Sequence, residues 1–183
     1  MQAAGDQISA ANAAVNLNKL LQISAGAVYT DEGESLEFDI KHRYKVLREV
    51  ISEASKKVLI FVPFKNVIDV LVDKLRQDGI TTEMVRGDVT ANQRTEIFKQ
   101  FQQTPNPRIL VIQPQAASHG VTLTAADTIV WWGPTSSVET YEQANARIHR
   151  QGQDHKCTVI QLAGSLAEKR VYSLLDNKLH THT

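Results

Sequence analysis

Val58-Leu59-Ile60-Phe61-Val62 is the first of four short apolar runs that decide the fold of this 183-residue chain. The other three are Ile109-Leu110-Val111-Ile112, Thr128-Ile129-Val130-Trp131-Trp132 and Thr158-Val159-Ile160-Gln161-Leu162. Each run is continuous rather than alternating and is rich in β-branched or aromatic residues, which is typical of strands covered on both faces. A weaker run at 81–86 predicts a fifth strand, nearer an edge of the sheet.

Helical patterns lie between these runs, and start and stop signals give their limits. Asp78-Gly79 ends the first, Thr90 caps a helix at 91–103, the capping box Ser136-x-x-Glu139 opens one to about Arg150, and the last starts at about Ser165. In this last helix the inward residues are expected to be Val171, Leu174, Leu175 and Leu179. The alternation of strands and helices predicts an α/β fold, a parallel sheet with helices on both faces.

Residues 1–56 have a different pattern and show no second core. Residues 9–24 are rich in Ala, Asn and Leu and predict a helix, 26–33 a turn or hairpin, and 40–56 an amphipathic helix. The chain therefore divides into an N-terminal helical extension, 1–56, that packs on an α/β core, 57–183.

Composition excludes several classes of protein. Twenty basic and twenty acidic residues cancel, which excludes a highly basic arm. Residues 1–40 hold one basic and six acidic residues, whereas 41–183 hold nineteen basic and fourteen acidic, so a phosphate-binding face is expected in the later part. Cys157 is the single cysteine, which excludes an internal disulfide and a cysteine-based zinc site. With no signal peptide and no apolar stretch of the ~20 residues that span a bilayer, the expected compartment is the cytoplasm, with no membrane partner.

The usual phosphate-binding motifs of parallel α/β domains are missing. The sequence has no G-x-x-x-x-G-K-[ST] and no G-x-G-x-x-G after a strand. Asp31-Glu32 looks like a magnesium-binding acidic pair, but it follows Tyr29-Thr30 rather than a buried strand. The histidines are scattered, so no metal site is predicted.

The segment 141–153 carries the most chemical information. On a helix of 100° per residue, Gln143, Arg147 and Arg150 fall within roughly a 60° arc. Two guanidinium groups on one face favour an anionic ligand, and their planar forks can meet γ-phosphate oxygens bidentately. The alternative is a solvated arginine face, or ion pairs with Glu139 and Glu142.

Three motifs in order resemble a known family. Gln143-x-x-x-Arg147-x-x-Arg150-x-Gly152-Gln153 resembles motif VI of the Swi/Snf-type helicase-like ATPases of helicase superfamily 2. The segment 116–127 resembles their motif V, and 58–64 resembles their motif IV. The resemblance covers roughly residues 10–178. The sequence around His119-Gly120 is most similar to that of phage-encoded members.

This resemblance implies the second, RecA-like lobe of a two-lobe DNA-dependent ATPase, with ATP and Mg²⁺ held mainly by the N-terminal lobe. Arg147 and Arg150 would be the arginine fingers, and Gln143 would orient them. Gly120 would let the backbone approach the nucleotide closely. Thr122, which stands where the family usually has Asn, would lie near the ribose.

The DNA contacts are expected at the carboxyl ends of the strands, where open α/β sheets place their ligands. Backbone N–H groups at helix N-termini bind phosphate without net charge, so a neutral domain can follow a strand of DNA. The residues expected there are Lys65, Asn66, Gly87, Gln115, Ser118 and His119, with Arg86 as a further cation. For Lys65 and Arg86 the alternative is a solvated surface residue. Trp131-Trp132 could stack on bases, but alternation puts them on opposite faces of a strand, one in the core and the other partly covered.

Together these features favour the second motor lobe of an ATP-dependent DNA helicase or translocase, monomeric and inactive without the P-loop lobe. Its expected partners are DNA and the N-terminal lobe of the same protein. If it is phage-encoded, its place is the cytoplasm of a bacterial host. One alternative is a non-catalytic RecA-like module that binds DNA or protein. A small-molecule α/β enzyme is a third possibility, for which no base–nucleophile pair is visible.

Overall fold

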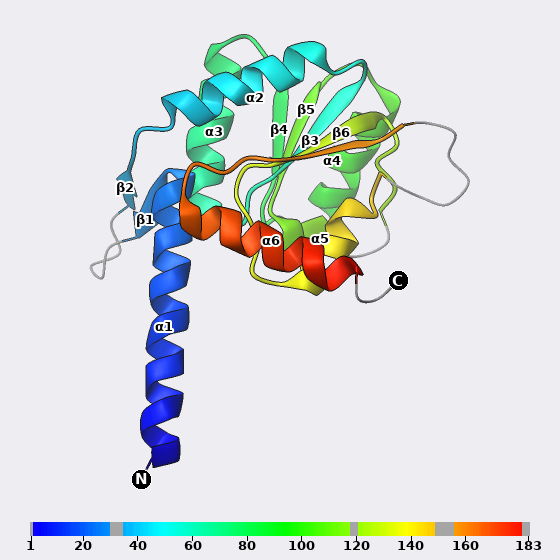
Figure 1. Cartoon of the computed structure of the whole chain (residues 1–183). Helices are drawn as coiled ribbons and strands as arrows, with labels where there is room; N and C mark the ends of the chain where they lie inside the picture. The colour runs from blue at the N-terminus through cyan, green and yellow to red at the C-terminus, as the bar shows by residue number, and fades with distance from the viewer. Residues whose placement is uncertain (1, 30–34, 118–120, 149–155, 181–183) are drawn as a thin grey trace.

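A five-stranded parallel sheet forms the centre of the computed structural model, which describes residues 2–29, 35–117, 121–148 and 156–180 (Figure 1). The strand order is β4-β5-β3-β6-β7. The strands are Lys57–Phe61 (β3), Thr82–Val85 (β4), Ile109–Ile112 (β5), Ala126–Trp131 (β6) and Thr158–Gln161 (β7). All five predicted strands are confirmed, and β4 lies at an edge as expected.

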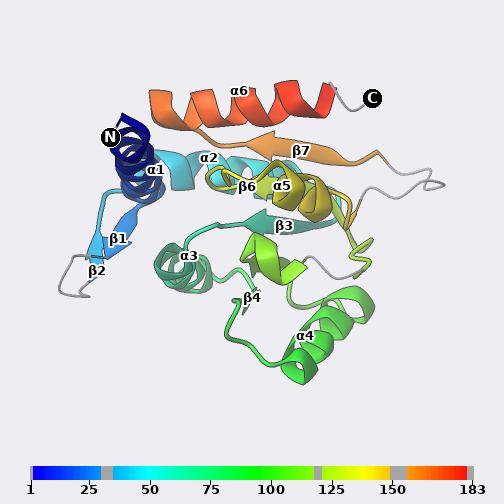
Figure 2. The same cartoon turned by 90° about the horizontal axis from the view of Figure 1, so that it is seen from below.

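Helices cover both faces of the sheet, as predicted (Figure 2). One face is packed by α2 (Lys41–Glu53) and α3 (Lys65–Gln77), which bury apolar side chains against β3, β5 and β6. The other is packed by α4 (Ala91–Gln103), α5 (Val138–Asn145) and α6 (Leu166–His180). A short 3-10 turn, η1 (Pro114–Ala117), follows β5. The strands are thus buried on both sides, which is why their sequences are continuously apolar.

Trp131 and Trp132 mark the two faces at the carboxyl end of β6. Trp131 packs beside Phe61 in one core, with ring centroids 4.9 Å apart. Trp132 lies in the other core, where its indole N–H donates to the Ala25 carbonyl over 2.7 Å. Both side chains are fully buried, so neither is only partly covered. Neither indole ring is therefore available for stacking on a base, which was the less favoured alternative.

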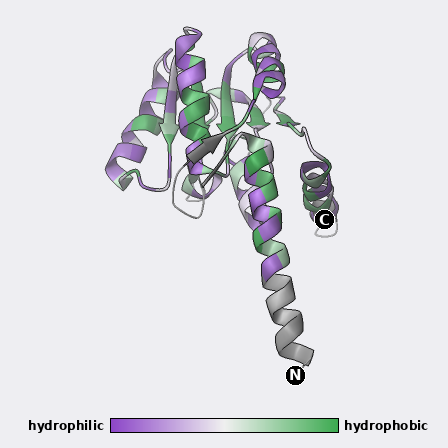
Figure 3. Ribbon diagram, turned by 90° about the vertical axis from the view of Figure 1, so that its left-hand side faces the viewer, coloured by the Kyte–Doolittle hydropathy of each residue, from purple (hydrophilic) through white to green (hydrophobic). Residues whose placement is uncertain are grey.

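The N-terminal segment holds α1 (Gln2–Ala25), a hairpin of β1 (Ala27–Tyr29) and β2 (Ser35–Glu37), and then α2. Leu21 and Ala25 are buried, whereas residues 12–20 are all exposed. Figures 1 and 3 show α1 projecting from the sheet and its helices. Packing of this segment on the core thus involves α2 and the end of α1, and the domain boundary at residue 56 stays a prediction.

Helix ends agree with the sequence in part. Thr90 caps α4 in a complete capping box with Gln93, as its position predicts. The capping box at Ser136 is wrong, because α5 begins one residue later, with the Ser137 hydroxyl accepting the Thr140 N–H. In α6 the prediction that Leu174 faces inward is wrong: it is 58% exposed, because it lies about 100° around the helix from the buried Leu175. Val171 and Leu175 are buried as predicted, and the side chain of Leu179 lies outside the described part of the chain.

Candidate nucleotide and nucleic-acid interface

The carboxyl ends of β3, β4 and β5 lie side by side at one edge of the sheet. The Val62 N–H donates to the Ile112 carbonyl over 3.0 Å, and the Gln113 N–H donates to the Val85 carbonyl over 2.9 Å. The segments that follow β3, β4 and β5 are therefore neighbours, as the predicted DNA-contacting residues require. Ser118 and His119 follow η1 but lie outside the described residues.

Arg147 is in a turn rather than on a helix. The predicted helix to about Arg150 ends at Asn145, so a shared helical face of Gln143 and Arg147 is wrong, while Arg150 lies outside the described residues. The Arg147 N–H bonds to the Ala144 carbonyl over 3.2 Å, and its own carbonyl accepts the Leu123 N–H over 3.0 Å. The Arg147 N–H thus bonds three residues back rather than four, as in a turn, and the Gln143 carbonyl that a continued helix would use accepts Arg147 Nε instead.

The Arg147 side chain lies against its own lobe. Its Nε donates to the Gln143 carbonyl over 2.8 Å and its Nη1 to the Val121 carbonyl at 3.5 Å. These bonds join the segment around residue 122 to the turn after α5. Thr122 is half-buried beside this junction, while Gly120 and Arg150 lie outside the described residues.

Side-chain contacts fix α5 on the sheet. Asn145 Oδ1 accepts the Trp131 indole N–H over 2.8 Å. The buried Tyr141 hydroxyl accepts from Gln161 Nε2 over 2.8 Å, and its burial raises the pKa of the phenol. Gln143 is half-exposed, and its Nε2 donates to Glu139 Oε1 over 3.1 Å. Glu139 thus contacts the amide of Gln143, whereas ion pairs of Glu139 and Glu142 with the two arginines stay a prediction.

The two cations expected to contact DNA are paired with acids of the same lobe. Lys65 Nζ lies 2.7 Å from Asp88 Oδ2. Arg86 Nη1 lies 3.0 Å from both carboxylate oxygens of Asp69, and its Nε lies 3.4 Å from Asp88 Oδ1. These four side chains carry no net charge together. The sequence reasoning identified the cations but missed both acids, although Asp88 lies only two residues after Arg86.

The remaining DNA-contact predictions differ in exposure. Gln115 is exposed and lines a 100 Å³ hollow between the end of α1 and the ends of β3 and β6, together with Phe64 and Thr135. The Gly87 N–H donates to Gln113 Oε1 over 2.9 Å. Asn66 is only 7% exposed, and its Nδ2 has no hydrogen-bond partner among the described residues. Its burial gives no support to a contact with DNA, which stays a prediction.

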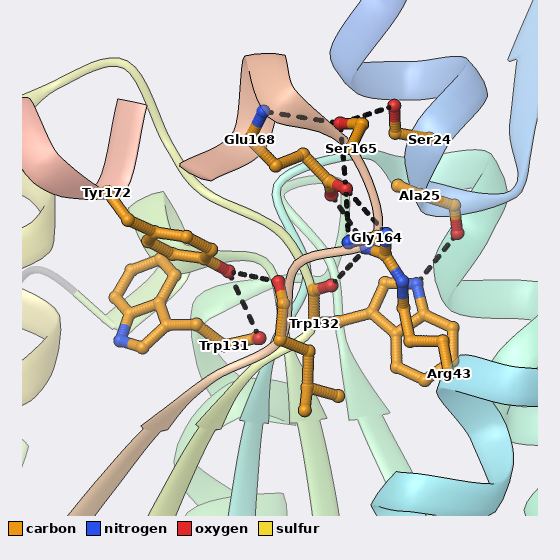
Figure 4. Close-up of polar contacts among 10 residues, drawn as sticks. Ser24, Ala25, Arg43, Trp131, Trp132, Gly164, Ser165, Glu168 and Tyr172 are labelled. Carbon is orange, nitrogen blue, oxygen red and sulfur yellow. Dashed lines mark hydrogen bonds and ion pairs between the residues drawn. The ribbon is translucent and has the colours of Figure 1, made fainter. Parts of the chain in front are cut away.

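A buried polar network joins α2 to α6 beside Trp132, the residue that follows β6 (Figure 4). Arg43 makes two hydrogen bonds to Glu168, 2.7 and 2.6 Å long, and a third to the Trp132 carbonyl. Glu168 also accepts the Gly164 N–H and the Ser165 hydroxyl. Ser165-x-x-Glu168 is a visible helix-start signal, but the pairing with Arg43 across 125 residues has none.

Among the described residues no group of His, Cys, Asp or Glu is arranged to hold a metal ion. The helices in the described ranges include none with the length and apolar character needed to cross a bilayer.

Comparison with known proteins places these features in a family. Residues 42–152 match the helicase conserved C-terminal domain, which is more than half of the chain. An uncharacterized ATP-dependent helicase of Schizosaccharomyces pombe is 30% identical over 141 residues. That alignment covers 76% of this chain but 14% of the relative, so the chain spans a small part of that protein.

Solved structures agree on the fold. The C-terminal part of the Fun30 ATPase domain has a TM-score of 0.67 at 22% identity, over 73% of this chain and 45% of that one. The SWI2/SNF2 ATPase core of Sulfolobus solfataricus, solved in complex with dsDNA, has a TM-score of 0.57 at 22% identity, over 75% of this chain and 29% of that one. The sheet is thus RecA-like, and the phage-type likeness stays a prediction. From its sequence match and its fold, the chain belongs to the family of helicase conserved C-terminal domains.

Proposed function

We propose that this chain is the second motor lobe of an ATP-dependent DNA helicase or translocase of the Swi/Snf type. The match to the helicase conserved C-terminal domain supports its assignment as the second lobe. The relative from S. pombe carries the name of an ATP-dependent helicase. A structural neighbour was solved with dsDNA, which supports DNA as the partner. The first lobe would bind ATP, because the P-loop motif does not occur in the 183 residues.

The observation that carries the proposal is the junction of the two predicted nucleotide-facing segments. Arg147 is bonded through its carbonyl to Leu123 and through its guanidinium to the Val121 carbonyl, so it lies beside Thr122. Residues 24 or more positions apart in the sequence thus form one local structure. A guanidinium group held in place can stabilise charge on a γ-phosphate without a reorganisation cost.

In this proposal ATP and Mg²⁺ would be shared between the two lobes. The described residues offer no carboxylate cluster for the metal ion, and Mg²⁺ bound by the first lobe would neutralise phosphate charge. The contribution of this chain would be the guanidinium groups of Arg147 and Arg150. Gln143 would orient them, and Gly120 and Thr122 would lie against the nucleotide. DNA would lie across the ends of β3, β4 and β5.

The test is DNA-stimulated ATP hydrolysis by the full-length parent protein carrying Arg147→Ala. A finger role predicts that turnover falls by about 10³-fold while DNA binding and the melting temperature change little. Arg170→Ala, which removes an exposed arginine of α6, is the matched control and should leave turnover unchanged. Full activity of Arg147→Ala would contradict the role.

One observation favours the rival function, a RecA-like module that binds DNA or protein without supporting hydrolysis. The hydrogen bonds of Arg147 to the Gln143 and Val121 carbonyls are what a structural arginine makes. In that case Arg147→Ala lowers the melting temperature of the parent and leaves the ATPase rate per folded molecule unchanged. The same variant therefore separates the two functions.

A further inference from the structure

Asp88 holds together the two cations at the carboxyl end of the sheet. Its Oδ2 lies 2.7 Å from Lys65 Nζ, and its Oδ1 lies 3.4 Å from Arg86 Nε. Lys65 follows β3 and Arg86 follows β4, the two strands that flank β5. A single carboxylate thus bridges side chains from two separate strand ends.

A carboxylate between a lysine and an arginine occupies the place that suits a phosphodiester group. Both anions present two oxygens that share a negative charge, and both accept charge-assisted hydrogen bonds from ammonium and guanidinium groups. The Lys65 and Asp88 side chains are 43% and 44% exposed. Water screens an ion pair at such a surface, so another anion can replace one partner at low cost.

Arg86 is held from its other side as well. Both carboxylate oxygens of Asp69, on α3, lie 3.0 Å from Arg86 Nη1, and only 26% of the Arg86 side chain is exposed. Arg86 would therefore keep its position if Asp88 moved away. The side chains of Asp69 and Asp88 are similarly exposed, 49% and 44%, but Asp88 alone of the two contacts both Arg86 and Lys65, so it is the one that a bridging anion would replace.

We propose that Asp88 is an internal competitor of the DNA backbone, which occupies a phosphate subsite made by Lys65 and Arg86 and sets how tightly this lobe binds DNA. This inference rests on the proposed function, because it takes DNA as the ligand at this edge of the sheet. A phosphate would have to displace the Asp88 carboxylate before it could contact both cations.

The electrostatics support continuous competition. The hydrogen bond from Lys65 is the main cause that lowers the pKa of Asp88, so the carboxylate remains charged at neutral pH. With Asp69 and Asp88 in place the cluster is neutral, which predicts weak attraction for DNA. Loss of the Asp88 charge alone leaves a net positive site.

The test compares variants of the whole chain by fluorescence anisotropy with a short labelled DNA duplex over a series of KCl concentrations. Asp88→Asn keeps the shape and removes the charge. We expect about tenfold tighter binding at low salt, and a log–log salt dependence steeper by about 0.9 for each additional phosphate that the protein neutralises. Asp73→Asn is the matched control, because it makes the same change in charge at an exposed position of α3; its binding should change less than about twofold.

Lys65→Gln, alone and combined with Asp88→Asn, completes a double-mutant cycle. In the Asp88→Asn background it should abolish the increase in affinity, whereas a general effect of net charge would survive it. Equal effects of Asp88→Asn and Asp73→Asn would overturn the competitor role while leaving DNA binding by the lobe intact. No DNA binding by any variant, each with a native melting curve, would also overturn it. The proposed function would then still be decided by ATP hydrolysis in the parent protein.

Discussion

Arg43 and Glu168 form an ion pair that water can hardly replace, since their side chains are 10% and 0% exposed. Removing one partner would leave the other charged and buried. Arg43→Met should therefore lower the free energy of unfolding by about 3–5 kcal/mol. Urea-induced unfolding of the wild type and of Arg43→Met measures this difference in the free energy of unfolding.

Arg48→Met is the matched control. Arg48 lies on the same helix and pairs with Asp78 over 2.6 Å, but these side chains are 44% and 38% exposed. A much smaller loss is expected, because exposed ion pairs contribute little to stability. Equal losses for the two variants would show that burial of the Arg43 pair has no special effect.

Tyr44 predicts a loss of stability at high pH. Burial and a hydrogen bond to Asp78 raise the pKa of its phenol to about 12, above its usual value of 10.0. The folded state thus holds this proton more tightly than the unfolded chain, and the stabilisation is complete below pH 10 and lost between about pH 10 and 12. Unfolding titrations over this range should show that Tyr44→Phe depends less steeply on pH than the wild type. Parallel curves would contradict the assignment.

At the residue level the sequence indicates the kind of side chain better than its partner. Lys65 and Arg86 were identified from their places after two strands, but their neutralisation by Asp88 and Asp69 was not. That pairing depends on the ends of β3 and β4 lying on either side of β5, which only the strand order determines. Arg147 was identified too, while its bonds to backbone carbonyls were not, because carbonyl acceptors have no sequence signal.

At the level of elements, the N-terminal cap of α4 offers a clean measurement. The Thr90 hydroxyl accepts the Gln93 N–H, and Gln93 Oε1 accepts the Thr90 N–H. Thr90→Ala should lower the free energy of unfolding by about 1 kcal/mol. Thr95→Ala, within the same helix, removes a hydroxyl that donates to the Ala91 carbonyl, and chemical denaturation should show a smaller loss. A larger loss for Thr95→Ala would refute the capping account.

Elements with a strong local signal were predicted and those that depend on other segments were not. The strands were found because burial on both faces makes them continuously apolar. The end of α5 was missed because Arg147 bonds through its side chain to the Gln143 and Val121 carbonyls and through its own carbonyl to Leu123, which are contacts without a sequence signal. The projection of α1 was also missed, since its residues have helix-forming character with or without a partner.

At the scale of the whole molecule, the chain should not hydrolyse ATP by itself. It has no P-loop motif, and its described residues form no metal-binding cluster. Pure protein with ATP, Mg²⁺ and DNA should release phosphate no faster than a blank in a coupled assay. Robust magnesium-dependent hydrolysis would contradict its proposed role as one half of a motor.

The α/β fold class and the parallel sheet could be predicted from the sequence, because strand and helix signals alternate along the chain. The strand order and the end of α5 could not, because they depend on contacts between segments. The site could be predicted only in outline. In the proposed function its chemistry would depend on a facing lobe, and the chain spans 14% of the relative from S. pombe.

The most direct measurement of the central claim is the turnover number of DNA-stimulated ATP hydrolysis by the full-length parent carrying Arg150→Ala. If this arginine reaches the γ-phosphate from the second lobe, turnover should fall by about 10³-fold or more, with Arg170→Ala as the unaffected control. A decrease of less than about threefold would contradict the claim.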